Sequence, residues 1–272
     1  MLGAAEIREL AEKLGIRPTK KLGQNFVIDP NTIHRIVGQA NLSPEDVVVE
    51  IGPGLGSLTL GILERVDYMI AVEIDPLLAS ELESTVSRHA PGKKVDLVRA
   101  DAMKVTELPK PPTALVANLP YNISVPVLLH FLEQFPSIEK GLVMVQSEVA
   151  HRLAAGPGSK EFGSPSLKLA WYGQARLAGN VARSIFWPVP GVDSSLVFFD
   201  TSARRDQSQR KLVFEAIDQA FLQRRKTLRQ ALANFAGSPA LAEELLIKAG
   251  VSPQARGEEL GIEQFIAIAR AK

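Results

Sequence analysis

Short apolar runs alternate with helical stretches from Val47 to about Asp200, and this alternation constrains the fold of the chain more than any other feature. The first five runs show no strict polar alternation, which is typical of buried parallel strands. Helical stretches such as Ser57–Arg65 and Pro76–Arg88 separate most of them, which predicts a doubly wound α/β sheet. The last two expected strands have no obvious helix between them, which predicts an antiparallel edge hairpin. The expected strands are Val47–Ile51, Tyr68–Glu73, Val95–Arg99, Ala114–Asn118, Leu142–Gln146, Ala175–Val181 and Leu196–Asp200.

Helical segments flank this core on both sides. Ala5–Leu14 and Asn31–Gln39 precede it, and helical periodicity resumes after a polar linker at 201–209. We therefore expect two domains: an α/β domain over residues 1–204 with an N-terminal helical extension, and a small all-α domain over residues 205–272.

Composition excludes several classes of protein. The chain has no cysteine, which excludes disulfide frameworks and thiolate zinc sites, and its four histidines lack metal-ligand spacing. No apolar run approaches the roughly 18–20 residues that a membrane span needs. The N-terminus has no apolar signal segment. We expect a cytoplasmic protein without a metal.

The loop after the first expected strand is rich in glycine, with Gly52, Gly54 and Gly56. Glycines let a backbone approach a ligand closely and turn into a helix N-terminus. The G-x-G-x-x-G dinucleotide fingerprint is not met, because its last position from Gly52 is Ser57. By itself the loop suits a dinucleotide or S-adenosylmethionine.

Acidic residues stand at the ends of the next two expected strands. Glu73 can accept hydrogen bonds from both ribose hydroxyls of a bound adenosine, and Asp101, followed by Ala102, is placed to reach an adenine amino group. For each acid alone, a helix N-cap is an equally good interpretation. Taken together, the glycine-rich loop and these two acids stand at three consecutive strand ends, and this combination favours S-adenosylmethionine over NAD.

The fourth expected strand ends in Asn118-Leu119-Pro120-Tyr121. Pro120 biases Leu119 toward extended geometry, so the Leu119 carbonyl can point outward as an acceptor. An exocyclic amine such as adenine N6 needs two acceptors for its hydrogens and a π surface for its ring. The tetrapeptide offers both, and it is a candidate site of amine methylation.

Net charge is only +1, but basic residues are clustered. Between Arg204 and Arg229, eight basic residues face three acids, and a second cluster contains Arg17, Lys20 and Lys21. Such patches suit a polyanion that docks in one orientation, but they also occur on solvated helix surfaces. Charge alone does not choose between the two.

Seven motifs, in order, resemble those of the small-subunit ribosomal RNA adenine dimethyltransferases, and the match covers nearly the whole chain. They are Leu22–Phe26, Glu50–Gly56, Glu73, Asp101-Ala102, Asn118–Ser124, Phe186–Ser195, and Ala220-Phe221 with Arg224–Leu228. Two departures are Val27, where the family has Leu, and Pro165, in a segment that the family writes Tyr-Gly-x-Leu-Ser. Just before it, the glycine-rich segment 154–164 is expected to be mobile, as a lid or as a plain connector.

The resemblance implies S-adenosylmethionine as cofactor, small-subunit ribosomal RNA as partner, N6,N6-dimethylation of adenine, and a Rossmann-like methyltransferase fold. It implies cofactor contacts at Gln24, Asn25, Val27, Gly52, Gly54, Glu73, Ile74, Asp101, Ala102 and Asn118. Catalysis would fall to Asn118, Leu119, Pro120 and Tyr121. We expect RNA docking through Arg224, Arg225, Lys226 and Arg229, supported by Lys20 and Lys21. A monomer is the default.

Three other interpretations compete. A large-subunit adenine methyltransferase of the macrolide-resistance type shares the fold and a similar catalytic motif, but Leu119 and the basic motif favour the small-subunit family. A ribosome-assembly factor could act mainly by binding, although intact Asn118, Tyr121 and Glu73 argue against lost catalysis. A protein glutamine N5-methyltransferase usually carries Asn-Pro-Pro-Tyr, so Leu119 argues against it.

Overall fold

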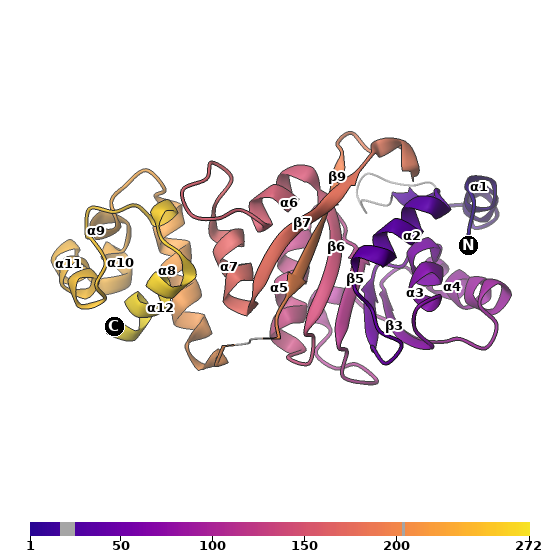
Figure 1. The fold of residues 1–272 in the computed structure, drawn as a ribbon, viewed down its shortest axis with the longest axis horizontal. Helices are drawn as coiled ribbons and strands as arrows, with labels where there is room; N and C mark the ends of the chain where they lie inside the picture. Colours follow the sequence, from indigo (N-terminus) through magenta and orange to yellow (C-terminus); the bar gives the residue numbers. More distant parts are fainter. Residues whose placement is uncertain (17–24, 203–204) are drawn as a thin grey trace. The chain divides into compact units, whose positions relative to one another are not determined.

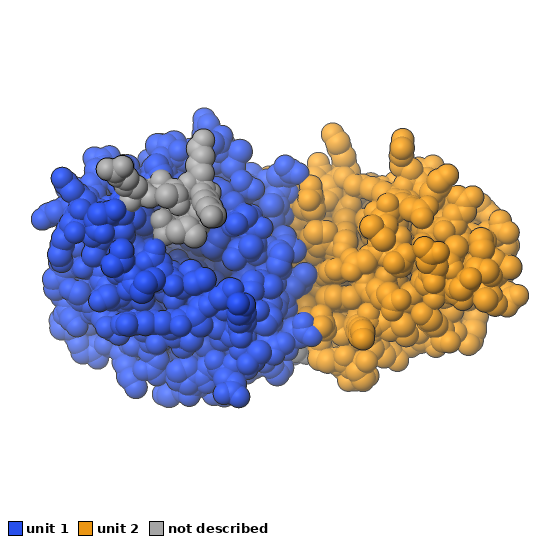
Figure 2. Space-filling view, turned by 180° about the vertical axis from the view of Figure 1, so that it is seen from behind, with its two compact units in different colours: residues 1–150, 177–202 blue, residues 151–176, 203–272 orange. Residues whose placement is uncertain are grey.

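The computed structural model describes residues 1–16, 25–202 and 205–272. The chain forms two compact units, shown in different colours in Figure 2. Unit 1 contains residues 1–150 and 177–202, and unit 2 contains residues 151–176 and 203–272. The predicted domain of residues 1–204 therefore differs from unit 1 by one inserted segment. Residues 151–176 lie within the α/β core in sequence, but they pack with the C-terminal helices.

A seven-stranded sheet forms the centre of unit 1 (Figure 1). Its strands are β2 (Val48–Ile51), β3 (Tyr68–Glu73), β4 (Lys94–Arg99), β5 (Ala114–Asn118), β6 (Lys140–Gln146), β7 (Gln174–Val181) and β9 (Ser194–Asp200). They lie in the order β4-β3-β2-β5-β6-β9-β7. The strands β2 to β6 pair in parallel, and β9 is antiparallel to β6. The predicted fold class is confirmed, and each strand begins and ends within two residues of its expected bounds.

Among the described residues, the α-helices that lie wholly within unit 1 are α1 (Ala4–Lys13), α2 (Pro30–Gln39), α3 (Ser57–Leu63), α4 (Pro76–His89) and α5 (Ser124–Gln134). The helix α2 begins where the Asp-Pro pair predicts. The Asp29 side chain accepts a hydrogen bond from the backbone N–H of Thr32, and Pro30 occupies the first turn, where no N–H is needed.

A second, two-stranded sheet was not predicted from the sequence. It pairs β1 (Phe26–Val27) antiparallel with β8 (Phe186–Trp187). The rings of Phe26 and Trp187 stack with their centroids 6.4 Å apart. The pairing of β1 with β8 attaches a segment near the N-terminus to the segment that precedes β9 in the sequence.

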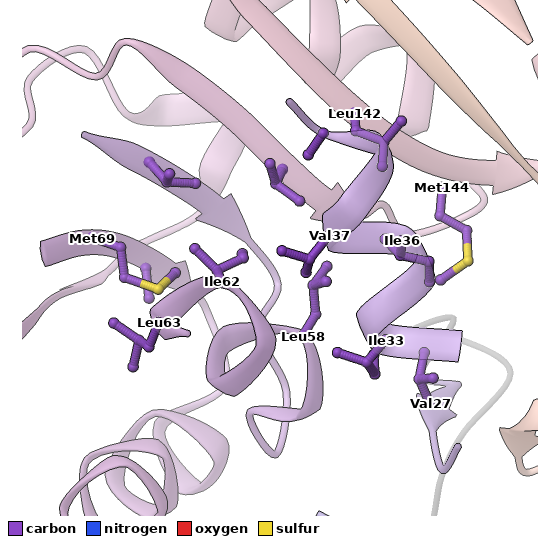
Figure 3. Close-up of a cluster of buried hydrophobic side chains, with 14 of the residues drawn as sticks. Val27, Ile33, Ile36, Val37, Leu58, Ile62, Leu63, Met69, Leu142 and Met144 are labelled. Carbon is purple, nitrogen blue, oxygen red and sulfur yellow. The ribbon is translucent and has the colours of Figure 1, made fainter. Parts of the chain in front are cut away.

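Helices α2, α3 and α4 bury their apolar sides against one face of the sheet. Figure 3 shows Ile33, Ile36 and Val37 of α2 meeting Leu58 and Ile62 of α3. The sheet contributes side chains spaced two residues apart on each strand, such as Met69 and Ala71 or Leu142 and Met144. This core holds the carboxyl ends of the strands in fixed positions.

Unit 2 is helical. Its elements include α7 (Ser164–Tyr172), α8 (Arg210–Leu222), α9 (Leu228–Ala231), α10 (Ala233–Ala236), α11 (Pro239–Lys248) and α12 (Ile262–Ala271), while α6 (Ser147–Leu153) leads into it. The helix α7 begins at Ser164 with Pro165 in its first turn, so the unusual proline fits the helix start.

The glycine-rich segment 154–164 is hydrogen-bonded within unit 2, rather than free as we expected. The N–H of Gly158 donates to the carbonyl of Glu258 over 2.9 Å. The Phe162 side chain is buried and meets the ring of Phe221 edge-on. These contacts support a connector packed on the helices of unit 2 and give no support to a lid.

Candidate active site

The neighbouring strands β2 and β5 lie at the point where the sheet order reverses. From β2 the chain continues to β3 and β4 on one side, and from β5 it continues to β6 on the other. Loops diverge at such a switch point and leave a crevice at the carboxyl ends of the strands. A cavity of about 240 Å³ lies there. Its lining includes the predicted residues Asn25, Val27, Gly52, Gly54, Glu73, Ile74, Asp101, Ala102, Asn118, Leu119, Pro120 and Tyr121.

The glycine loop after β2 shapes the floor of this cavity. Gly52 and Gly54 have φ values of 68° and 59°, which side chains disfavour. A Cβ atom on Gly54 would lie 3.0 Å from Cε1 of Phe26. Apart from Gly52 itself and its two chain neighbours, no described residue has an atom within 4 Å of where a Cβ of Gly52 would be. The glycines therefore let Phe26 pack on the loop and keep the space above Gly52 open to a ligand.

Glu73, at the end of β3, is a buried carboxylate held by backbone donors. Its Oε2 accepts the N–H of Gly54 over 3.2 Å, and its Oε1 accepts the N–H of Asp75 over 2.9 Å. Burial raises the pKa of Glu73, and these N–H groups oppose the rise. Each carboxylate oxygen can accept more than one hydrogen bond, so Glu73 can also receive a ligand's hydroxyl groups.

Glu50, inside β2, is a second buried acid of the cavity that the sequence reasoning assigned to the loop but to no role. Its Oε2 accepts a hydrogen bond of 2.6 Å from the Thr59 hydroxyl. Burial and, to a smaller extent, the charge of Glu73 raise the pKa of Glu50 to about 8. Glu50 is therefore mostly neutral at pH 7. An acid inside an otherwise apolar strand was the sequence signal that could have identified it.

The helix-cap interpretation holds for two other strand-end acids. Asp75 accepts the N–H of Leu77 and caps α4, and Asp101 accepts the N–H of Met103 over 3.0 Å. Asp101 also lines the cavity. A carboxylate can cap a turn through one oxygen and offer the other to a ligand, so the cap does not exclude the predicted adenine contact.

Asn118 ends β5 and is oriented by a distant backbone group. Its Nδ2 donates a hydrogen bond of 3.2 Å to the carbonyl of Asn25. Because this bond uses the donor end of the amide, Oδ1 is left as an acceptor on the cavity side. Sequence reasoning could not anticipate this contact between residues 93 positions apart.

Leu119 and Tyr121 line the cavity together with Asn118, and we call this part of the lining, residues 118–121, the rim. The N–H of Leu119 donates to the carbonyl of Met144, and no described residue donates to the carbonyl of Leu119 itself. The Tyr121 hydroxyl lies 2.9 Å from Oγ of Ser194. Burial raises the pKa of Tyr121, so its hydroxyl keeps its proton at neutral pH. The rim thus offers two oxygen acceptors next to an aromatic ring.

The cavity suits S-adenosylmethionine on four observations. Glu73 places an acidic group in the lining, where it can accept hydrogen bonds from a ligand. The Ile74 side chain is 62% exposed and offers an apolar surface to an adenine ring. Oγ of Ser57 is buried in the lining without a partner among the described residues. Gly52 leaves open space beside them. When bound, this cofactor supplies an electrophilic methyl group on a sulfonium.

Gln24, Lys20 and Lys21, which were predicted to contact cofactor or RNA, lie outside the described residues. Within the described ranges no helix is long and apolar enough to cross a membrane. The same ranges contain no group of three or more His, Asp or Glu side chains that could hold a metal ion.

The predicted RNA-docking residues of unit 2 fall into two classes. Arg224 pairs with Glu258 over 2.7 Å and donates to the carbonyl of Lys160, and Arg229 pairs with Glu243 over 2.7 Å. Arg225 and Lys226 are exposed in the turn between α8 and α9. Part of the clustered positive charge is therefore engaged in ion pairs within unit 2 and is less available to bind a polyanion.

Comparison with known proteins supports the family resemblance over nearly the whole chain. The ribosomal RNA adenine dimethylase family model matches residues 16–272. The chain is 60% identical to ribosomal RNA small subunit methyltransferase A of Kineococcus radiotolerans, covering 99% of this chain and 91% of that protein.

Two solved structures share the fold. A dimethyladenosine transferase from Plasmodium falciparum matches with a TM-score of 0.76 and 23% identity over 88% of this chain and 94% of that one. The 23S rRNA methyltransferase ErmE matches with a TM-score of 0.67 and 27% identity over 91% of this chain and 99% of that one.

Fold and cavity define a Rossmann-like methyltransferase that uses S-adenosylmethionine. The sequence comparisons narrow the assignment from this class of protein to one family. The chain belongs to the ribosomal RNA adenine dimethylase family.

Proposed function

We propose that this protein transfers methyl groups from S-adenosylmethionine to N6 of adenines in small-subunit ribosomal RNA, dimethylating two adjacent adenines during subunit maturation. The supporting observation is the paired acceptor at the end of β5. The Asn118 amide donates to the Asn25 carbonyl, which leaves its oxygen as an acceptor, and the next residue, Leu119, lines the same cavity.

Two acceptors match the two hydrogens of adenine N6. That nitrogen is a poor nucleophile because its lone pair is delocalised into the ring. Hydrogen bonds from N6 to Oδ1 of Asn118 and to the carbonyl of Leu119 favour a pyramidal nitrogen. They also stabilise the positive charge that would develop on N6 as its bond to the methyl carbon forms and the carbon–sulfur bond breaks, with the electron pair going to sulfur. N6 then gives up one hydrogen as a proton to solvent. The residues act by alignment and electrostatics, and no covalent enzyme intermediate forms.

The target base must leave its stack to reach this rim. Tyr121 then provides a surface on which the base stacks, and such contacts are worth about 1–3 kcal/mol. At the other end of the cavity, Glu73 would hold the ribose hydroxyls of the cofactor, and Ile74, Asp101 and Ala102 would surround its adenine. Asn25, Val27, Gly52 and Gly54 would complete the cofactor contacts.

Unit 1 would thus carry out methyl transfer, and unit 2 would dock on the RNA. Arg225 and Lys226 are the primary candidates for phosphate contacts, because they are exposed. Arg224 and Arg229 would contribute through their remaining donors. Because the proposed substrate is ribosomal RNA, we propose that the protein acts in the cytoplasm. A monomer stays the expectation.

Methyl transfer can be tested with radiolabelled cofactor and unmethylated small or large ribosomal subunits, followed by mapping of the labelled nucleotides. We expect dimethyladenosine in small-subunit RNA alone. Label in large-subunit adenines would instead identify an enzyme of the macrolide-resistance type. Subunit binding without any label would identify an assembly factor.

A further inference from the structure

The motif Phe186–Ser195, which contains Val192-Asp193-Ser194, has no role in the function described so far. Ser194 is the first residue of β9 and is fully buried. Its partner on the sheet is Gln146 of β6, directly opposite. A buried hydroxyl at this position needs a hydrogen-bond partner. That partner is the Tyr121 hydroxyl, 2.9 Å away and 73 residues earlier in the chain.

We propose that Ser194 is a positioning residue, which holds the ring of Tyr121 at the angle needed to stack on the target adenine. This inference rests on the proposed function. Tyr121 follows Pro120 in a loop, whereas Ser194 belongs to a strand that is hydrogen-bonded along its length to β6. The hydroxyl pair therefore fixes the far end of a loop ring to the rigid sheet. Without it, the ring would lose its hydrogen bond to the sheet.

The contact matters most for the second methyl transfer. Unmethylated N6 has two hydrogens, one for Oδ1 of Asn118 and one for the carbonyl of Leu119. After the first transfer only one hydrogen remains, so one of the two aligning hydrogen bonds is lost. The orientation of the monomethylated base then depends more on stacking against Tyr121, and so on the bond that holds this ring to Ser194.

The test is the product distribution of three variants acting on unmethylated small subunits. Ser194→Ala and Tyr121→Phe remove the hydroxyl pair from opposite sides. Ser195→Ala is the matched control, because it deletes the neighbouring buried hydroxyl, whose partners are Ser147 and Asn180 instead. Single-turnover rates of the first and second transfer are measured separately, with cofactor affinity by calorimetry and the unfolding temperature of each protein.

We expect Ser194→Ala and Tyr121→Phe to slow the second transfer by about tenfold and the first by about threefold, as loss of one hydrogen bond allows. Monomethyladenosine should accumulate in both, while cofactor affinity stays unchanged. The double variant should behave like either single one, since both remove the same bond. Ser195→Ala should keep the wild-type product ratio.

An unchanged product ratio in Ser194→Ala and Tyr121→Phe would overturn the inference, and so would an equal shift in Ser195→Ala. If Ser194→Ala does not fold, Tyr121→Phe decides alone, because it keeps the ring and deletes only the oxygen. A wild-type protein that fails to methylate small subunits would overturn the proposed function together with this inference. Active wild type with unaffected variants overturns the inference alone.

Discussion

The cavity of unit 1 and the basic segment of unit 2 (residues 224–229) use charged side chains in opposite ways. In the cavity, Glu73 is buried and receives two backbone N–H groups at the end of a strand. In the basic segment, Arg224 and Arg229 are part-exposed and pair with acids of the same unit. A charge at a strand end is thus held in the cavity by backbone groups, whereas a local excess of charge is partly neutralised by ion pairs.

The largest effect should come from the rim of the cavity. Asn118→Ala removes the amide oxygen that would accept an N6 hydrogen, and loss of one such electrostatic contact costs about 100- to 1000-fold in rate. Methyl incorporation into small subunits measures the loss, and calorimetry should still detect bound cofactor. Full activity in this variant would contradict the catalytic role of Asn118. The cavity would then be no better supported as a functional site than the basic segment.

A smaller effect is expected at the cofactor end of the same cavity. Glu73→Gln keeps the shape of the side chain but loses the charge that strengthens hydrogen bonds to ribose hydroxyls. Charge-assisted hydrogen bonds contribute about 1.5–3 kcal/mol each, so cofactor affinity should fall at least tenfold. Calorimetric titration measures this change. Glu83→Gln is the control, because Glu83 is exposed and pairs with Arg99. Equal affinities for wild type and Glu73→Gln would refute the assignment.

In the basic segment, Arg225 and Lys226 should contribute to binding, whereas Arg224 should contribute to stability. Replacing both Arg225 and Lys226 by Ala should weaken small-subunit binding about tenfold and reduce the salt dependence by about 1.5 in logarithmic slope. Stability should not change. Arg224→Ala should instead lower stability by about 1 kcal/mol or less, as expected for a part-exposed ion pair. Filter binding across a salt series and thermal unfolding distinguish the two. Unchanged binding in the double variant would show that charge exposure does not identify the docking residues either.

On the cavity side of the comparison, stability as well as activity can be tested, because Glu50 should give the protein a pH dependence of stability. Its pKa is about 8 in the folded protein, against an ordinary value of 4.5 for a glutamate side chain. The unfolded chain therefore loses this proton at lower pH, and stability falls as pH rises from about 4.5 to 8. Glu50→Gln removes this contribution. Its unfolding temperature without cofactor, relative to wild type, should increase across that interval. A constant difference would mean that Glu50 is ionised throughout.

Much of the fold could be predicted, because each strand of the large sheet leaves its own apolar run between turn residues. The run 114–118 and the sheet strand β5 have the same bounds. The strands β1 and β8 could not be found in this way, since two residues are too few to show a period. The sequence did not suggest that residues 151–176 pack with the C-terminal helices, because the pattern of a helix does not reveal what the helix packs against.

The site could be predicted as a set of residues but not as a geometry. Strand ends gave Glu73, Asp101 and Asn118 because the carboxyl ends of parallel strands meet at one edge of the sheet. The bonds that orient them join distant residues, such as Asn118 with Asn25 and Tyr121 with Ser194. Local sequence carries no record of such partners. For the same reason, counting charges could not show which arginines form ion pairs, because Glu258 lies 34 residues from Arg224.

The pairing of β1 with β8 has a consequence for how the enzyme is made. Phe26 packs against Gly54 of the cofactor loop, yet its strand partner is Trp187. A growing polypeptide therefore carries the whole glycine loop long before the segment that steadies one wall of the cavity has been translated. We expect nascent chains shorter than about 190 residues to lack a finished cofactor cavity. The protein would then gain its ability to bind the methyl donor late in its own synthesis.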